Sequence, residues 1–214
     1  MNGHLAAAAQ SPLALAVVTD DDDPDARGRV RVRIAALDVE LWAAVLHPSV
    51  GDGYGVALLP KIDEVVVVAF VTPELPIVLG AVGSGRSSAP SESTPAHTRY
   101  SITTPDGTVL LLDDEEGPKL SVTTPAGNKF ELTDDAGGKA VIDVQGTTVT
   151  VTSSKVEVQA SGEVKVQAGS VKVSAGMVDV DAGMAKFSGV VKCATLIADS
   201  VVGTSYTPGA GNIW

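Results

Sequence analysis

Val164-Lys-Val-Gln-Ala-Gly-Ser-Val-Lys-Val-Ser-Ala-Gly-Met-Val-Asp-Val180 repeats one unit, in which an apolar-polar-apolar triplet is followed by small residues. Related units recur every seven or eight residues from residue 149 to residue 187. A short fixed period is typical of strands that stack along an axis, because one unit cannot bury its own apolar face. We therefore expect a core formed by Val149, Val151, Val156, Val158, Val164, Val166, Val171, Val173, Val178, Val180 and Phe187.

These residues can form a core only if a second apolar surface packs against them. Each unit offers only two inward side chains, mostly Val, which suits a narrow prism of three chains better than the wider cross-section of a single-chain solenoid. Full burial of one Val gains roughly 1.5 to 3 kcal/mol, so many such positions offset much of the ordering cost once three chains wrap together. The sequence predicts a homotrimeric needle over residues 101–190, an intertwined triple-stranded β-helix, with its tip at residues 191–214. A single-chain solenoid is the alternative.

A longer repeat precedes the valine units. Ile102-Thr-Thr-Pro-Asp-Gly107 is echoed 20 residues later by Val122-Thr-Thr-Pro-Ala-Gly127. Pro-Asp-Gly and Pro-Ala-Gly are typical turns between strands. Upstream, residues 86–100 are rich in Ser, Pro and Thr and have no apolar period, which predicts a linker between two architectures.

Residues 13–85 predict a different fold, after a short N-terminal segment at residues 1–12. Short apolar runs alternate with Asp, Gly and Pro signals, and five or six strands in this length suit a small closed barrel of the OB kind. One of the expected strands is 55–59. Arg29, Arg31 and Arg33 alternate with Val30, Val32 and Ile34, which predicts a cationic outer face and an apolar inner face for that strand.

Composition supports an all-β protein and excludes several classes. Aromatic residues make up 4% of the chain, β-branched and small residues dominate, and we expect almost no helix. The net charge of −11 disfavours a nucleic-acid partner, because phosphate binding needs clustered cations. No apolar run approaches the roughly 20 residues of a membrane span, and the first residues make a poor signal peptide. Cytoplasmic synthesis is the expectation, and the single Cys193 fits a reducing compartment.

A set of motifs in the first half resembles a known family when taken in order and spacing. The motifs are Asp20-Asp-Asp-Asp-Pro-Asp-Ala-Arg-Gly-Arg-Val-Arg-Val-Arg33, Leu41-Trp42-Ala-Ala-Val, Gly51-Asp-Gly-Tyr-Gly55, Leu59-Pro60, Val65-Val-Val-Val-Ala-Phe70 and Pro76-Ile-Val-Leu-Gly80. Together they resemble the OB domain of phage baseplate assembly protein V and VgrG-type spike proteins of contractile injection systems. The valine repeats are similar to the triple-stranded β-helix of that family.

The resemblance implies a structural protein rather than an enzyme. It implies a homotrimer seated on a separate baseplate hub protein at the barrel end, with a needle that transiently meets and pierces a target cell envelope. Such a spike would be assembled into the baseplate of a phage tail, a tailocin or an extracellular injection system, and release outside the producing cell is a further expectation. No segment resembles the lysozyme-like domain of some relatives.

Two other motifs resemble ligand-binding loops in part. The run from Asp20 to Asp25 invites a calcium site, but it lacks the Gly and Glu of an EF-hand loop, which favours an exposed acidic turn. Gly51-Asp-Gly-Tyr-Gly55 lacks the Gly-Lys-Ser/Thr of a phosphate loop and predicts a turn. No pattern predicts a metal site, a cofactor or a catalytic triad.

The C-terminal residues predict an apolar tip. Three copies of Tyr206, Ile213 and Trp214 would gather around the axis of a trimer. We expect this platform to receive a PAAR-like tip protein, and the alternative is that these residues fold back to seal the prism. Two other classes of protein stay as alternatives: a carbohydrate-binding tail spike, and a binder of single-stranded nucleic acid built on the barrel.

Overall fold

The computed structural model describes residues 12–72, 74–83 and 88–205 of the chain. Within these ranges the chain is all-β, with three short 3-10 turns and no α-helix, as the composition predicted. The chain divides into two compact units, Met1–Val164 and Lys165–Trp214, and each is described by itself.

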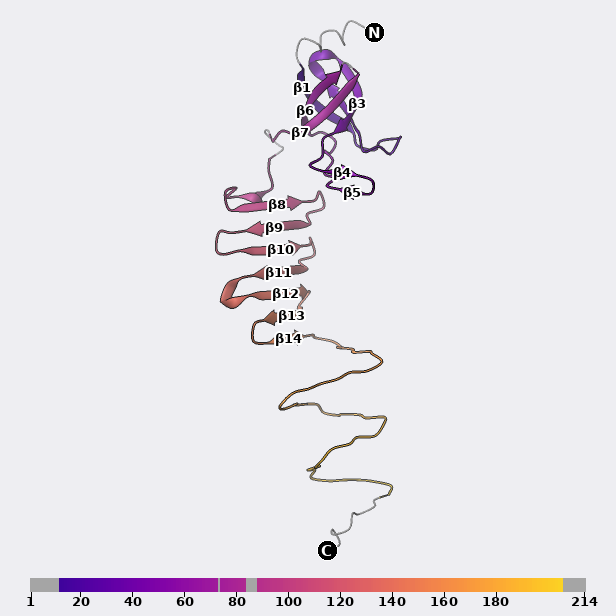
Figure 1. Ribbon diagram of the computed structural model, residues 1–214, viewed down its shortest axis with the longest axis vertical. Coiled ribbons are helices and arrows are strands. Elements are labelled where there is room, and N and C mark those ends of the chain that lie inside the picture. The colour runs from indigo at the N-terminus through magenta and orange to yellow at the C-terminus, as the bar shows by residue number, and fades with distance from the viewer. Residues whose placement is uncertain (1–11, 73, 84–87, 206–214) are drawn as a thin grey trace. The chain divides into compact units, whose positions relative to one another are not determined.

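Five strands close into a barrel, drawn in indigo and purple in Figure 1. Its order is β1 (Leu13–Asp20), β2 (Val30–Ile34), β3 (Val39–Val45), β7 (Leu75–Ala81) and β6 (Val65–Thr72). Neighbouring strands are antiparallel, except that β3 and β7 run parallel, with Ala44 opposite Ile77. The parallel pair closes the sheet on itself and leaves no open edge. The predicted OB-like barrel is confirmed.

The barrel core follows from alternation along each strand. Val30, Val32 and Ile34 are fully buried, while the intervening Arg31 and Arg33 are exposed, so the predicted two-faced strand is confirmed. Strands β1, β3, β6 and β7 contribute the other buried apolar side chains, which are Ala16, Val18, Ala43, Val66, Val68 and Val78. The core is therefore built almost entirely from Val, Ile and Ala.

The expected strand at 55–59 is wrong. The chain there leaves the barrel as a small hairpin, β4 (Val50–Gly51) paired with β5 (Tyr54–Gly55), and residues 56–64 form no strand. Because β3 already pairs with β7, the closed barrel has no edge at which a further strand could add. The 3-10 turns are η1 (Ala35–Leu37), η2 (Ser91–Ser93) and η3 (Asp135–Gly137).

A seven-stranded antiparallel sheet follows, in which every strand pairs with its neighbours in sequence (Figure 1). Its strands are β8 (Arg99–Thr103), β9 (Val109–Asp113), β10 (Lys119–Thr123), β11 (Lys129–Thr133), β12 (Lys139–Val144), β13 (Thr147–Thr152) and β14 (Val156–Gln159). This meander differs from the intertwined arrangement expected from residue 101 onward, because its backbone partners come from the same chain.

The turns explain why the meander forms. Gly107 has a φ of 87° and its N–H donates to the carbonyl of Thr104 at 2.9 Å. The turn at Gly127 repeats that geometry, with a φ of 82° and an N–H bond of 2.9 Å to Thr124. A left-handed glycine allows the chain to reverse sharply, so each new strand returns beside the previous one. The predicted 20-residue repeat is therefore a repeat of hairpins.

Residues 160–205 contain no strand or helix and run back and forth in extended segments, drawn in orange to yellow in Figure 1. Bends recur at Gly162, Gly169, Gly176 and Gly183, which keeps the seven-residue period of the sequence. None of these glycines has the left-handed φ found in the meander, so the chain bends here without making a hairpin. The meander and this segment thus use glycine in two different ways.

Candidate functional site

One face of the seven-stranded sheet carries two unbroken columns of apolar side chains. The register of the strands aligns them directly, with Val149 opposite Val158 and Leu120 opposite both Leu112 and Leu132. The first column is Tyr100, Leu112, Leu120, Leu132, Ala140, Val151 and Val156, and the second is Ile102, Leu110, Val122, Phe130, Ile142, Val149 and Val158. We call these fourteen residues the apolar face.

The apolar face is open to solvent in the single chain. Tyr100 is 65% exposed at one end and Val156 is 68% exposed at the other, and the side chains between them are exposed or half-buried. An apolar patch that continues over seven strands exceeds what a monomeric soluble protein usually leaves uncovered. The arrangement indicates an interaction surface.

The opposite face of the same strands is mostly polar, although it also carries Val109, Leu111 and Val141. At its start, Asp113 on β9 is buried and forms ion pairs with Arg99 Nε at 3.0 Å and Lys119 Nζ at 3.4 Å. The Arg99 guanidinium also reaches Glu115, with Nη2 lying 2.7 Å from Oε2. Both cations stand opposite Asp113 in the register, so the cluster ties β8, β9 and β10 together.

The protonation of Asp113 reflects these contacts. The backbone N–H of Glu115 donates to Oδ1 of Asp113 at 3.0 Å, and this bond is the main cause that lowers the pKa of the Asp113 carboxyl. Burial opposes that effect, and the neighbouring Lys119 and Arg99 lower the pKa further. Asp113 is therefore held as a carboxylate at the polar face.

The structure brings together four of the residues predicted for the core. Val149 faces Val158 and Val151 faces Val156, all on the apolar face. The other predicted core residues lie in the extended segment after Gln159, where they have no strand partner and are exposed in the single chain. They are Val164, Val166, Val171, Val173, Val178, Val180 and Phe187. Their assignment to a trimer core stays a prediction.

Sequence reasoning missed the ten residues of the apolar face that precede Val149. These side chains come from β8 to β12, and β8, β10 and β11 alternate polar and apolar residues in the same phase, whereas β9 and β12 carry longer apolar runs. That alternation, aligned across the 20-residue repeat, is a signal that could have found them. The predicted tip residues Tyr206, Ile213 and Trp214 lie outside the described residues.

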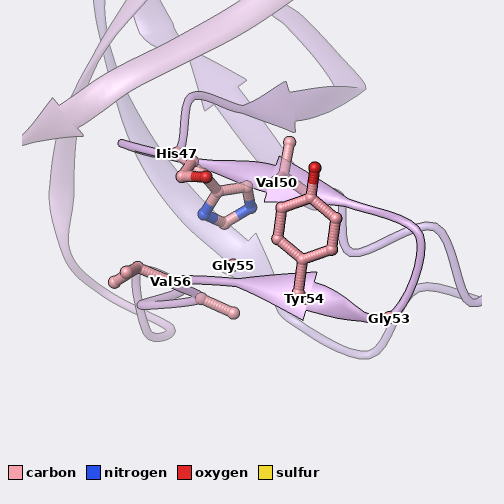
Figure 2. Close-up of a pocket in the computed structure, with 8 residues that line it drawn as sticks. His47, Val50, Gly53, Tyr54, Gly55 and Val56 are labelled. Carbon is pink, nitrogen blue, oxygen red and sulfur yellow. The ribbon is translucent and has the colours of Figure 1, made fainter.

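The β4-β5 hairpin contains the motif Gly51-Asp-Gly-Tyr-Gly55. Figure 2 shows His47 and Tyr54 among the residues that line a shallow hollow of about 230 Å³ beside this hairpin. A side chain at Gly55 would overlap with the backbone of Ser49 and Val50, and Gly55 has a φ of 144°, so glycine is required there for the hairpin to fold. The lining of the hollow contains no Asp, Glu, Lys or Arg. The segment is a turn, as the sequence predicted.

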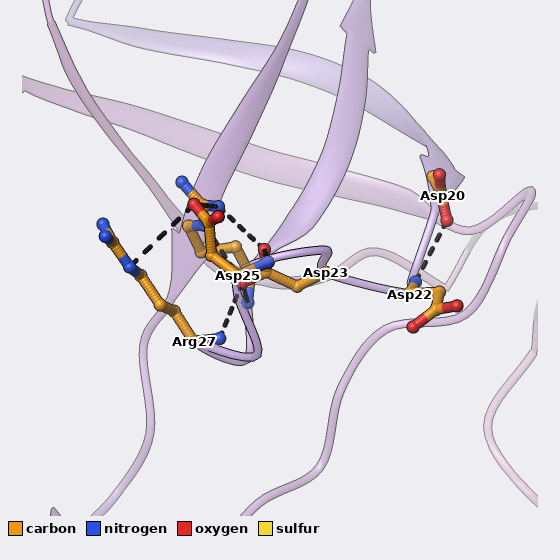
Figure 3. A network of polar contacts seen from close by, with 6 residues as sticks. Asp20, Asp22, Asp23, Asp25 and Arg27 are labelled. Atoms are coloured by element: carbon orange, nitrogen blue, oxygen red, sulfur yellow. Dashed lines mark hydrogen bonds and ion pairs between the residues drawn. The ribbon is translucent and has the colours of Figure 1, made fainter.

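The acidic run forms an ordered loop between β1 and β2, shown in Figure 3. Both oxygens of Asp23 accept bonds from the Arg29 guanidinium, at 2.7 and 3.0 Å, and its Oδ2 also accepts the backbone N–H groups of Arg27 and Arg29. The Arg29 side chain lowers the pKa of Asp23 far below its usual range. Arg29 also bonds Asp25 at 2.7 Å and lies over the ring of Trp42, 5.6 Å from its centre. The contacts between Asp23 and Arg29 therefore hold the loop in one conformation.

The part of the chain that the structure describes contains no group of three or more His, Cys, Asp and Glu side chains placed to hold a metal ion. Among the same residues, no helix is long and apolar enough to cross a membrane.

Barrel and apolar face together define a class of protein: an OB-type barrel joined to a β-meander with an uncovered hydrophobic side. Residues 14–82 match the model of the family described as the Type VI secretion system/phage-baseplate injector OB domain. The family resemblance predicted from the sequence motifs is thereby confirmed over the barrel. No curated protein matches the chain.

Proposed function

We propose that this protein is a non-enzymatic, homotrimeric spike at the baseplate tip of a contractile injection system. The match of residues 14–82 to the injector OB domain supports a structural role associated with a baseplate. The observation that carries the trimeric spike is the apolar face, because a surface of this kind needs a partner along its whole length.

Three copies of the sheet fit the chemistry of that partner. The apolar face is made of aliphatic and aromatic side chains, and its two columns contain no charged residue. A copy of the same face is equally apolar, so three faces turned toward one axis enclose a dry core. The polar faces, with the cluster of Arg99, Asp113 and Lys119, then remain toward water.

The extended segment is proposed to continue the same prism as an intertwined β-helix. Its apolar positions keep a period of seven residues, and Val166 is 73% exposed in the single chain. The backbone groups of this segment have no partner strand within the part of the chain that the structure describes, and in this proposal strands from two other copies supply the pairing. In this proposal the needle begins as three packed antiparallel sheets and continues as an intertwined β-helix.

The ends of the spike are proposed to meet other proteins. A separate hub protein would hold the barrel end, in keeping with the injector OB match. A PAAR-like tip protein would sit on the C-terminal residues, and the needle would meet a target cell envelope when the machine contracts. The finished spike would be a component of a tail-like particle assembled after synthesis in the cytoplasm.

The experiment is a pair of substitutions one residue apart on β13, Val149→Lys and Thr150→Lys. Val149 lies on the apolar face and Thr150 on the polar face, where Glu157 is its opposite neighbour. Light scattering gives the native mass of the full-length protein and of each variant. The parent and Thr150→Lys are expected at three times the 21.7 kDa of one chain, whereas Val149→Lys is expected to lose the trimer.

The control reads out whether Val149→Lys acts on assembly or on folding. Circular dichroism should show retained β-structure in the monomeric variant, because β13 pairs with β12 and β14 of its own chain. A parent protein of 21.7 kDa would contradict the spike and favour a chain that works alone. Equal masses for the two lysine variants would contradict the apolar face as the trimer core.

A further inference from the structure

The outer surface of the barrel has an apolar side of its own. Strand β6 reads Val-Val-Val-Val-Ala-Phe-Val-Thr and is apolar on both faces. Val66 and Val68 fill the barrel core, but Val65, Val67 and Ala69 point away from it. A strand that is apolar on both faces is typical of a sheet covered on both sides. Among the described residues, Val65, Val67 and Ala69 are half-buried and Val71, further along the same strand, is exposed.

The neighbouring strands extend this outer side. On β1, Leu15 pairs with Val67 and Val17 pairs with Val65, and on β7 Ile77 pairs with Ala69. Leu15 is 64% exposed and Val71 is 63% exposed. We call the whole set the outer patch: Leu15, Val17, Val65, Val67, Ala69, Val71, Leu75, Ile77 and Leu79. None of its members is polar.

The other side of the same barrel is charged. Arg31 and Arg33 of β2 point outward beside Glu40 of β3, and Arg31 Nη2 lies 3.4 Å from Glu40 Oε2. Ion pairs of this kind are compatible with water and need no partner. The barrel is therefore solvated over β2 and β3 and apolar over β1, β6 and β7.

The tether between barrel and sheet indicates what covers the outer patch. The N–H of Val82 still bonds Val65 of the barrel at 2.7 Å, and the turn η2 already contacts β8 of the sheet. Only residues 83–89 lie between Val82 and Pro90, a length that spans at most roughly 30 Å when fully extended. In a trimer, three barrels are thus confined near one axis at an effective concentration in the millimolar range.

Electrostatic repulsion limits which sides of those barrels can come into contact. Residues 13–82 of each chain hold eleven Asp and Glu against five Lys and Arg, a net charge of −6, and surfaces of like charge repel at short distance. The outer patch is uncharged, so it is the side of the barrel that two copies can bring together at the least electrostatic cost. We propose that the outer patch is the surface through which the barrels of one assembly pack on one another. This inference rests on the proposed trimer.

The test measures access to single cysteines in the full chain, with Cys193→Ser as the background. Leu15→Cys and Val71→Cys place a thiol on the outer patch, and the matched control Arg33→Cys places one on the charged side of the barrel. A charged maleimide labels each native protein, and labelling in denaturant gives the reference rate. We expect both patch thiols to react about tenfold or more slowly than the control in the trimer.

The outcomes separate this inference from the proposed function. Patch thiols that react as fast as Arg33→Cys, in a protein whose mass is that of a trimer, would overturn the packing of barrels and leave the trimer standing. Patch thiols that become slow only inside a complete tail-like particle would assign the outer patch to another baseplate protein instead. A monomeric mass would contradict both proposals at once.

Discussion

Asp113 lies between two cations, with its Oδ2 atom 3.0 Å from Nε of Arg99 and 3.4 Å from Nζ of Lys119. These three residues come from three successive strands of the sheet. The same carboxylate also accepts the N–H of Glu115, so the first two hairpins share one charged centre. Protonation of Asp113 at low pH should therefore destabilise the sheet.

The first prediction concerns acid stability. The folded-state pKa of Asp113 lies below its ordinary value of 3.8, so its contribution to stability is present above that value. The contribution is lost as the pH falls below 3.8 toward the folded-state pKa. Asp113→Asn should lower the melting temperature at pH 7 and weaken its dependence on pH below about 4. Glu116→Gln, at an exposed position in the same loop, should change neither.

The second prediction concerns the acidic loop. Asp23→Asn should destabilise the barrel at pH 7, because it removes the charge that faces Arg29 and weakens the bonds that close the loop. Asp22→Asn is the matched control, since Asp22 is exposed and its backbone rather than its side chain makes the bond to Asp20. Trp42 fluorescence in a Trp214→Phe background reports the barrel, because Arg29 lies over the Trp42 ring. Equal denaturation midpoints for the two variants would show that the contacts between Asp23 and Arg29 do not stabilise the barrel.

A third prediction tests the barrel core. Ile34→Ala should lower the free energy of unfolding by about 2 to 5 kcal/mol, because Ile34 is fully buried and the vacated space cannot refill. Arg33→Ala, one residue earlier and exposed, should stay within about 0.5 kcal/mol of the parent. Urea titration followed by Trp42 fluorescence measures both. Similar losses in the two variants would contradict the inward alternation of β2.

The fourth prediction tests the hairpin turns. Gly107→Ala should cost about 1 to 2 kcal/mol, because alanine disfavours the φ of 87° found there. Asp106→Ala, in the same turn at a residue without positive φ, should change stability by less than about 0.5 kcal/mol. Thermal melting followed by circular dichroism gives the two values. A harmless Gly107→Ala would mean that the turn is not left-handed in solution.

Much of the barrel could be predicted from the sequence. The alternation of arginine with Val30, Val32 and Ile34 gave the faces of β2 correctly, because a strand has a strict period of two residues. The error at residues 55–59 has a different origin. That run is apolar enough for a strand, but barrel closure depends on the distant pair of β3 and β7, which no local pattern reveals.

The apolar face was predictable only in part. The triplets at Val149 and Val156 could be recognised because they repeat along the sequence. Tyr100 and Phe130 lie in strands whose residues vary more. Apolar alternation predicts which side chains share a face, but it does not say whether the adjacent strand belongs to the same chain. That depends on the backbone at the turn. Gly107 and Gly176 are both glycines that follow a strand or triplet in the sequence. Only the structure shows that the backbone of Gly107 is left-handed and that of Gly176 is not.

The pairing of each strand of the sheet with its neighbours in sequence has a consequence for the order of events after synthesis. Contacts between adjacent strands close short loops, so the strands from Arg99 to Gln159 can form quickly within one chain and before any second copy arrives. The segment after Gln159 has no such local route. In the proposed trimer, its ordering would wait for an encounter between chains, and the preformed sheets would set the alignment of that encounter.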